Sequence, residues 1–318
     1  MNWKKKLLAL GLSLALTLSL AACGQKTAAP EQTDEPAQTE EPAEAPETPD
    51  DTAAFKIAAL KGPTAMGLVE LMSLSDTANE MMEGKEVVVS TKNTYDFTLA
   101  GSADEVTPAL IKGELDMACV PANLAAVLYG KTDGALEVLA VNTLGVLYIV
   151  ESGDTVQSMA DLKGKTIVAA GKGSTPEYAL ASGQAAIALL PQPFVTVAQT
   201  KIEGLRMALD LTAEWDKLDN GSGLITGVIV ARRDVVEANP GAVDSFLQNY
   251  AASVEWVNAN NADAAQLIAE YGIIEAAPVA EMALPYCNIV CITGSEMKDK
   301  LSGYLQVLAD AEPSSVGG

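Results

Sequence analysis

Histidine is absent from the sequence of 318 residues. Its absence excludes Ser-His-Asp and Cys-His catalysis and the usual histidine-based zinc and copper sites. Cysteine is scarce: after Cys23, the chain has only Cys119, Cys287 and Cys291. Within a strand, the Cα atoms of Cys287 and Cys291 would be roughly 13 Å apart, which is too far for a disulfide. We therefore expect these three cysteines to be core residues, and we expect no catalytic residue and no metal site.

Basic residues are also few. The chain has 20 lysines and arginines against 42 aspartates and glutamates, and its formal net charge is −22. Because an acidic protein repels nucleic acid and anionic lipid headgroups, we expect neither of them as a partner. After the first 22 residues, we find no apolar run long enough to span a bilayer.

The first 22 residues have the pattern of a secretory signal peptide. Three lysines at 4–6 precede an apolar run at 7–20, and small residues then lead to Cys23. The stretch LAAC at 20–23 is typical of a bacterial lipobox, so we expect cleavage before Cys23 and a lipid anchor on its thiol. The alternatives are an ordinary signal peptide with an incidental cysteine and a retained transmembrane helix, for which the run is short.

Residues 23–54 are rich in proline and acidic residues and contain no aromatic side chain. Such a segment cannot bury enough apolar surface to offset the entropy lost on ordering, so we predict a disordered tether. We expect the folded body to begin near residue 55 and to be large enough for one large or two ordinary domains.

Apolar runs of strand length alternate with helical patterns through the rest of the chain, which predicts parallel β-α-β units. We predict strands at 55–60, 86–91, 95–99, 115–120, 136–143, 146–152, 166–170 and 222–234. Capping boxes at Ser102–Glu105 and Ser174–Glu177 predict two helix starts, and Asn239 followed by Pro240 predicts the start of a long helix over 239–260.

Two stretches repeat one pattern, LIKGELDMACVPAN at 110–123 and LASGQAAIALLPQP at 180–193. In each, a helix should end at a glycine, Gly113 or Gly183, and a strand should then stop at a proline. The GKGST loop at 171–175 lacks the spacing of a nucleotide-binding P-loop, so we do not expect nucleotide hydrolysis.

Several of these stretches together resemble the substrate-binding lipoproteins of ABC importers, in particular the nitrate/sulfonate/thiamine-precursor group. The resemblance covers nearly all of residues 55–318 and is carried by the following segments: KIAALKGPTAMGLVELM, LIKGELDMACVPANLAAVLY, VNTLGVLYIVE, SMADLKGKTIVAAGKGSTPEY, ALLPQPFVT and ALDLTAEWDK.

The resemblance implies an α/β fold of the periplasmic binding protein type II, with two lobes, mixed and mostly parallel sheets and a cleft between the lobes. Lobe 1 would comprise 55–143 and 226–318, and lobe 2 would comprise 144–225. We expect lobe 2 to be shortened, because EYAL runs directly into ASGQAAIALLP, and the chain ends at PSSVGG where the group continues.

In that fold, strand carboxyl ends from both lobes meet at the cleft. The resemblance and the loop chemistry together give the following expected solute contacts: Lys61, Thr64, Met66, Asn123, Gly173, Ser174, Thr175, Tyr178, Gln192 and Phe194. The free N–H groups after the GKGST loop would offer donors to an oxygen of the solute.

The resemblance implies a receptor that captures a small organic or oxyanion solute and delivers it to an ABC permease and its ATPase. We expect a monomer without a cofactor or enzymatic activity, held by its lipid on the outer face of the bacterial cytoplasmic membrane. A heterocycle synthase is known on a similar fold, but its chemistry relies on histidine. A sensor or adhesion module that no longer serves transport is the other alternative.

Overall fold

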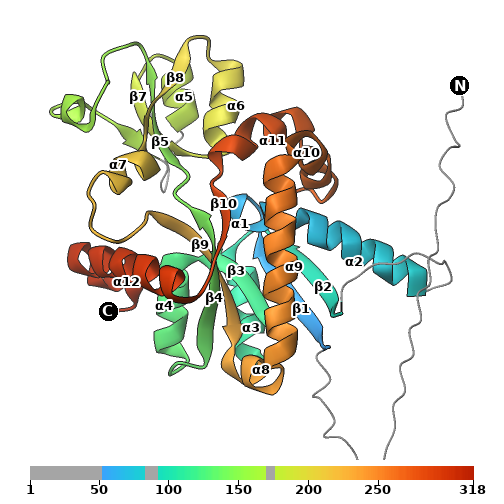
Figure 1. Cartoon of the computed structure of the whole chain (residues 1–318). Coiled ribbons are helices and arrows are strands. Elements are labelled where there is room, and N and C mark those ends of the chain that lie inside the picture. Colours follow the sequence, from blue (N-terminus) through green and yellow to red (C-terminus); the bar gives the residue numbers. More distant parts are fainter. Residues whose placement is uncertain (1–51, 83–91, 170–175) are drawn as a thin grey trace, which may run out of the picture. The chain divides into compact units, whose positions relative to one another are not determined.

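The computed structural model describes residues 52–82, 92–169 and 176–318, and these residues form two β-sheets with surrounding helices (Figure 1). The first sheet has the strand order β10-β4-β9-β3-β1-β2. Its strands are β1 (Ala54–Leu60), β2 (Thr94–Ala100), β3 (Met117–Pro121), β4 (Leu136–Leu144), β9 (Ile225–Arg232) and β10 (Ile289–Ile292). The second sheet has the order β6-β7-β5-β8, with β5 (Leu147–Ser152), β6 (Val168–Ala169), β7 (Ile187–Pro191) and β8 (Leu205–Asp210).

Both sheets are mixed, as expected, but the expectation that they are mostly parallel is wrong. Three strand pairs are parallel, β1–β2, β1–β3 and β6–β7. Five are antiparallel, β3–β9, β4–β9, β4–β10, β5–β7 and β5–β8. The two pairs of β9 follow from the path of the chain, which leaves the first sheet along β4 and returns along β9 in the opposite direction.

Helices follow most strands. They are α1 (Pro63–Met66), α2 (Val69–Met82), α3 (Ala103–Lys112), α4 (Ala122–Lys131), α5 (Pro176–Ala181), α6 (Phe194–Lys201), α7 (Leu211–Asp216), α8 (Arg233–Ala238), α9 (Pro240–Ala259), α10 (Asn261–Glu270), α11 (Ala277–Ala283) and α12 (Gly294–Ala311). Three 3₁₀ helices complete the described chain, η1 (Met159–Leu162), η2 (Leu284–Tyr286) and η3 (Pro313–Val316).

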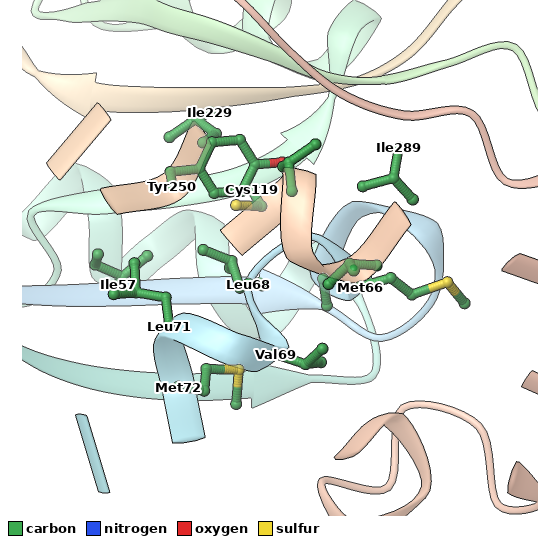
Figure 2. Packing of buried hydrophobic residues seen from close by; sticks show 14 of the residues in the cluster. Ile57, Met66, Leu68, Val69, Leu71, Met72, Cys119, Ile229, Tyr250 and Ile289 are labelled. Carbon is green, nitrogen blue, oxygen red and sulfur yellow. The ribbon is translucent and has the colours of Figure 1, made fainter. Parts of the chain in front are cut away.

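The first sheet has a core on each face. In β1, Phe55, Ile57 and Ala59 lie in one apolar cluster, and Ala58 lies in the other, as the two-residue period of a strand requires. Figure 2 shows part of the first cluster, in which side chains from α1 and α2 pack with Cys119 of β3 and Tyr250 of α9. The second sheet has two smaller clusters in the same way.

The repeated sequence pattern has the structure that its residues predict. Gly113 and Gly183 follow α3 and α5 with φ of 79° and 71°, in the left-handed region that glycine adopts without a steric penalty. Pro121 and Pro191 are the last residues of β3 and β7. A helix begins at the next residue after Pro121 and three residues after Pro191.

Some local predictions are wrong in detail. Ser102 precedes α3, but its hydroxyl donates a 3.0 Å hydrogen bond to the Glu105 carboxylate and does not cap the helix backbone. The start of α9 directly after Asn239 is confirmed, but the Asn239 side-chain amide donates to the Val235 carbonyl and does not cap the helix. The strand predicted at 166–170 is reduced to β6. The predicted strand at 86–91 and the residues Ser174 and Thr175 of the second capping box lie outside the described residues.

Candidate functional site

The chain passes between the two sheets at two places. Gly145 and Val146 join β4 to β5, and residues 217–224 join α7 to β9. The strand registers show which sheet ends lie at these crossings: Pro121 and Leu144 lie beside the start of β9, and Pro191 lies beside Leu147 at the start of β5. We call this region the junction and define it as 61–64, 121, 142–148, 192–194, 210–212, 225–227 and 286–288. The carboxyl ends of β1, β3, β7 and β8 all lie there.

The main-chain carbonyl of Gly145 ties three segments together at the junction. It accepts hydrogen bonds of 2.9 Å from the Thr212 hydroxyl and 2.6 Å from the Asn288 side-chain amide. The N–H of Leu144 donates to the Asn288 carbonyl at 3.1 Å. A Cβ atom at Gly145 would overlap Thr212 Oγ1 and lie 2.6 Å from Leu224. The crossing from β4 to β5 is therefore packed closely against α7 and against the residues that precede β10.

On the side of the first sheet, Thr64 and Asn142 hold the loop that follows β1. The Asn142 amide donates to the Thr64 carbonyl at 3.1 Å, and the Thr64 hydroxyl donates to the Leu60 carbonyl at 2.9 Å. Both side chains are buried. Gly227 of β9 lies directly beneath them, because a Cβ atom there would be 2.5 Å from Thr64 Cγ2 and closer still to Asn142 Oδ1.

On the side of the second sheet, Tyr148 and Asp210 face each other in the β5–β8 register. Tyr148 is buried, and its hydroxyl donates a 2.8 Å hydrogen bond to the Tyr286 carbonyl. Burial, together with the negative charge of Asp210, raises the pKa of Tyr148, so its phenol stays protonated and acts as a donor. The Asp210 carboxylate accepts from the Thr212 and Ala213 N–H groups at the start of α7.

Four of the predicted contact residues lie next to the first sheet, in α1 and α4 or directly before α1. Thr64 is in the junction and buried. Lys61 is exposed, and a Cβ atom at Gly272 would lie 3.6 Å from its Nζ, so its ammonium group lies beside the C-terminal end of α10. Asn123 is exposed and donates a long 3.4 Å hydrogen bond to the Ser315 carbonyl. Met66 is fully buried in the first apolar cluster (Figure 2).

Three others lie on elements of the second sheet. Gln192 is buried. Its side-chain oxygen Oε1 accepts a hydrogen bond from the Thr196 hydroxyl, and its main-chain N–H donates to the Val146 carbonyl at 2.9 Å. Phe194 at the start of α6 and Tyr178 in α5 are exposed. Gly173, Ser174, Thr175 and Cys23 lie outside the described residues. Of the predicted residues, the structure brings Lys61, Thr64, Gln192 and Phe194 to the junction.

Several junction residues of the structure were not predicted from the sequence. Tyr148, Asn142 and Asn288 make hydrogen bonds between segments far apart in the chain. Nothing in their local pattern separates them from ordinary strand and turn residues, because their partners are set by the tertiary fold. Tyr286 also belongs to this group, with its ring 6.3 Å from that of Tyr148 at 89°.

The described residues contain no group of three or more histidine, cysteine, aspartate or glutamate side chains placed to hold a metal ion. Burial raises the pKa of the Cys119 and Cys287 thiols to about 12 and that of Cys291 to about 11. These thiols are therefore protonated at neutral pH, which disfavours a role as nucleophile or ligand. None of the helices in the described ranges combines the length and the apolar character that a membrane span needs.

A cavity of about 900 Å³ lies between α4, α12, the first sheet and residues 316–318. Its walls are mostly alanine, leucine and valine side chains of these elements. It has the size of a small-molecule site, but the described polar groups that converge at the junction do not line it.

Comparison with solved structures decides the fold. An ABC transporter protein from Parabacteroides distasonis matches with a TM-score of 0.65 and 21% identity, over 83% of this chain and 95% of that chain. The periplasmic aliphatic sulphonate binding protein SsuA from Escherichia coli matches with a TM-score of 0.62 and 16% identity, over 83% and 90% of the two chains. The chain has the periplasmic binding protein fold.

A third match of the same fold is the alkanesulfonate-binding protein SsuA from Xanthomonas axonopodis pv. citri, solved with bound MOPS. Its TM-score is 0.56 and its identity 14%, over 83% of this chain and 93% of that chain. No family model and no curated protein sequence matches the chain. In a periplasmic binding protein fold, the junction defined above occupies the position between the two sheets.

Proposed function

We propose that this chain is the solute-binding component of an ABC importer and that it captures a small solute at the junction. One observation carries the proposal: strand carboxyl ends of both sheets, β1 and β3 from one and β7 and β8 from the other, lie at the two chain crossings. Ligands of open α/β sheets bind at such ends. The solved proteins with this fold are named as ABC transporter and sulfonate-binding proteins.

We assign residues 55–143 and 226–318 to lobe 1 and residues 144–225 to lobe 2. This division follows the two sheets, because β5 to β8 make up the second sheet and the other strands make up the first. Contacts across this division include the Tyr148–Tyr286 and Asn288–Gly145 hydrogen bonds of the junction, and others lie on different elements. The rings of Trp215 in α7 and Tyr304 in α12 lie 5.8 Å apart, and α6 contacts α11.

We place the protein outside the cytoplasmic membrane, held by a lipid on Cys23. The basic residues at 4–6, the apolar run at 7–20 and the LAAC stretch support this location. The acidic, proline-rich segment that follows would hold the folded body away from the membrane surface. A permease and its ATPase would be the partners that receive the solute.

The proposed contacts are the exposed predicted residues at the strand ends: Lys61, Asn123, Tyr178 and Phe194. The predicted loop residues Gly173, Ser174 and Thr175 remain part of this proposal. Thr64 and Gln192 hold the loops at the junction through buried hydrogen bonds. Met66 supports α1 from the core.

The proposal is tested in two steps with the full chain. A thermal-shift screen of small solutes should identify a ligand, since a ligand at 100 times its dissociation constant adds about 2.7 kcal/mol to the free energy of unfolding. Uptake of that solute by the native host should then be lost when the gene is deleted and restored by the wild-type chain. Unchanged uptake in the deletion strain would contradict a transport role. A ligand found in the screen would then indicate a sensor.

A further inference from the structure

Large apolar side chains are exposed around the second-sheet end of the junction. Phe194 at the start of α6 is 53% exposed, Tyr286 in η2 is 42% exposed and Met282 in α11 is 48% exposed. Phe194 follows the end of β7. The Tyr286 carbonyl accepts a hydrogen bond from Tyr148 at the start of β5, and β5 pairs with β7. Because α6 contacts α11, these side chains come from two neighbouring helices and the turn after them. Exposed apolar side chains that gather at one place mark a binding surface.

Tyr178 extends this surface. It is 63% exposed near the start of α5. The strand before α5 is β6, which runs parallel to β7, so its carboxyl end lies at the same end of the second sheet as Pro191. We call Tyr178, Phe194, Met282 and Tyr286 the apolar rim.

The arginines of the chain are not available to the junction. The sequence contains three, Arg206, Arg232 and Arg233. Arg206 lies at the start of β8 and binds Glu151 at 2.6 Å. Arg232 and Arg233 lie at the far end of β9, where Arg232 pairs with Asp234 and Arg233 lies 3.8 Å from Glu137. The registers place all three at the strand ends opposite the crossings.

The charges that do lie at the junction also disfavour an anion. The Asp210 carboxylate occupies the start of α7 and accepts from the Thr212 N–H at 2.8 Å. A helix start that already holds a carboxylate has its favourable anion position filled. Lys61 directly follows β1. Its ammonium group lies beside the C-terminal end of α10, because a Cβ atom at Gly272 would be 3.6 Å from its Nζ. That position already stabilises a positive charge.

We propose that the solute held at the junction is an uncharged molecule with an aromatic or apolar face, and not a sulfonate or another strong anion. This inference rests on the proposed solute-binding function. Planar, bidentate arginine groups are the preferred side-chain partners of strong oxyanions, and this junction lacks them among its described residues. The apolar rim instead offers ring faces and a thioether that stack on a planar solute.

The test is a thermal-shift and calorimetric comparison on the full chain with two probe sets at millimolar concentration. The uncharged set is nicotinamide, thymine and indole, and the anionic set is ethanesulfonate and benzenesulfonate. We expect at least one uncharged probe to raise the melting temperature and both sulfonates to leave it unchanged. Phe194→Ala and Tyr286→Ala should each weaken binding of that probe by about tenfold, which corresponds to about 1.4 kcal/mol.

Tyr129→Ala is the matched control, because Tyr129 in α4 is also 53% exposed but lies outside the apolar rim. It should leave the affinity unchanged. A shift with the sulfonates alone would overturn the inference and leave the solute-binding function standing. Probe binding that neither Phe194→Ala nor Tyr286→Ala weakens would also overturn it. So would the absence of any shift while uptake in the host still depends on this protein.

Discussion

The hydroxyl of Tyr148 in β5 donates a 2.8 Å hydrogen bond to the main-chain carbonyl of Tyr286 in η2. The two residues are 138 positions apart in the chain and come from opposite sides of the chain crossings. Their rings also meet edge to face, at 6.3 Å and 89°. The second sheet is thereby fixed to the segment that leads into β10 of the first sheet, next to the Gly145 carbonyl.

Replacement of Tyr148 by phenylalanine should lower the free energy of unfolding by about 1 kcal/mol, because the Tyr286 carbonyl loses its donor. Urea denaturation of the full chain measures this change. Tyr286→Phe is the control, since the bond uses the main chain of Tyr286 and not its hydroxyl. A Tyr148→Phe variant as stable as the wild type would show that ring packing, which both variants keep, and not the hydrogen bond, fixes the two segments.

Replacement of Gly227 by alanine should destabilise the junction. A Cβ atom there would lie 2.5 Å from Thr64 Cγ2 and would overlap Asn142 Oδ1. Overpacking of this kind typically lowers the free energy of unfolding by about 1–3 kcal/mol. A lower midpoint of denaturation would measure this loss. Gly223→Ala is the control, because its nearest neighbour would be a Lys300 atom at 3.8 Å. A Gly227→Ala variant as stable as the wild type would mean that the β1 loop adjusts freely.

The sequence predicted the elements well where local chemistry decides them. Gly113 and Gly183 end their helices in the left-handed region, and Pro121 and Pro191 end their strands, because these residues act through their own backbone geometry. The alternation of strands and helices likewise predicted an α/β body, because it follows from the burial of each element's apolar face, whereas the division into two lobes was implied by the resemblance.

Strand direction and most of the site could not be predicted in this way. The antiparallel position of β9 between β3 and β4 depends on where the chain returns to the first sheet, and no local pattern encodes that. The same holds for Tyr148 and Asn288, whose partners are distant in sequence. Met66 shows the opposite limit: it was expected as a solute contact, but its side chain lies in the core.

Replacement of Cys23 by alanine should release the protein from membranes or leave it unprocessed, because a lipobox cysteine provides both the lipid attachment and the new N-terminus. Fractionation of the native host, with an antibody to the folded body, measures the distribution. Cys119→Ala serves as the control, since Cys119 is buried in the core and should not affect attachment. Membrane attachment that survives Cys23→Ala would contradict the lipobox interpretation.

A buried carboxylate organises the far end of the second sheet. Glu151 at the end of β5 accepts hydrogen bonds from the Thr155 N–H and hydroxyl, from the Val156 N–H and from Arg206. Burial alone would raise the pKa of Glu151, but these bonds outweigh it and lower the pKa from 4.5 to about 2. Arg206 also donates to the carbonyls of Gly153 and Val156, so the whole turn depends on this ion pair.

Because the pKa of Glu151 is lower in the folded chain than in the unfolded chain, its contribution to stability is complete above about pH 4.5. It should be lost as the pH falls towards 2. A shift of this size corresponds to about 3 kcal/mol. Glu151→Gln should therefore lower the free energy of unfolding by about that amount at pH 7 and flatten its dependence on pH between 2 and 4.5, as measured by urea denaturation across that range.

Asp154→Asn is the matched control, because Asp154 lies 3.4 Å from the same Arg206 but its side chain is largely exposed. It should change the free energy of unfolding by less than about 0.5 kcal/mol. A Glu151→Gln variant with the wild-type pH profile would show that other carboxylates control acid unfolding.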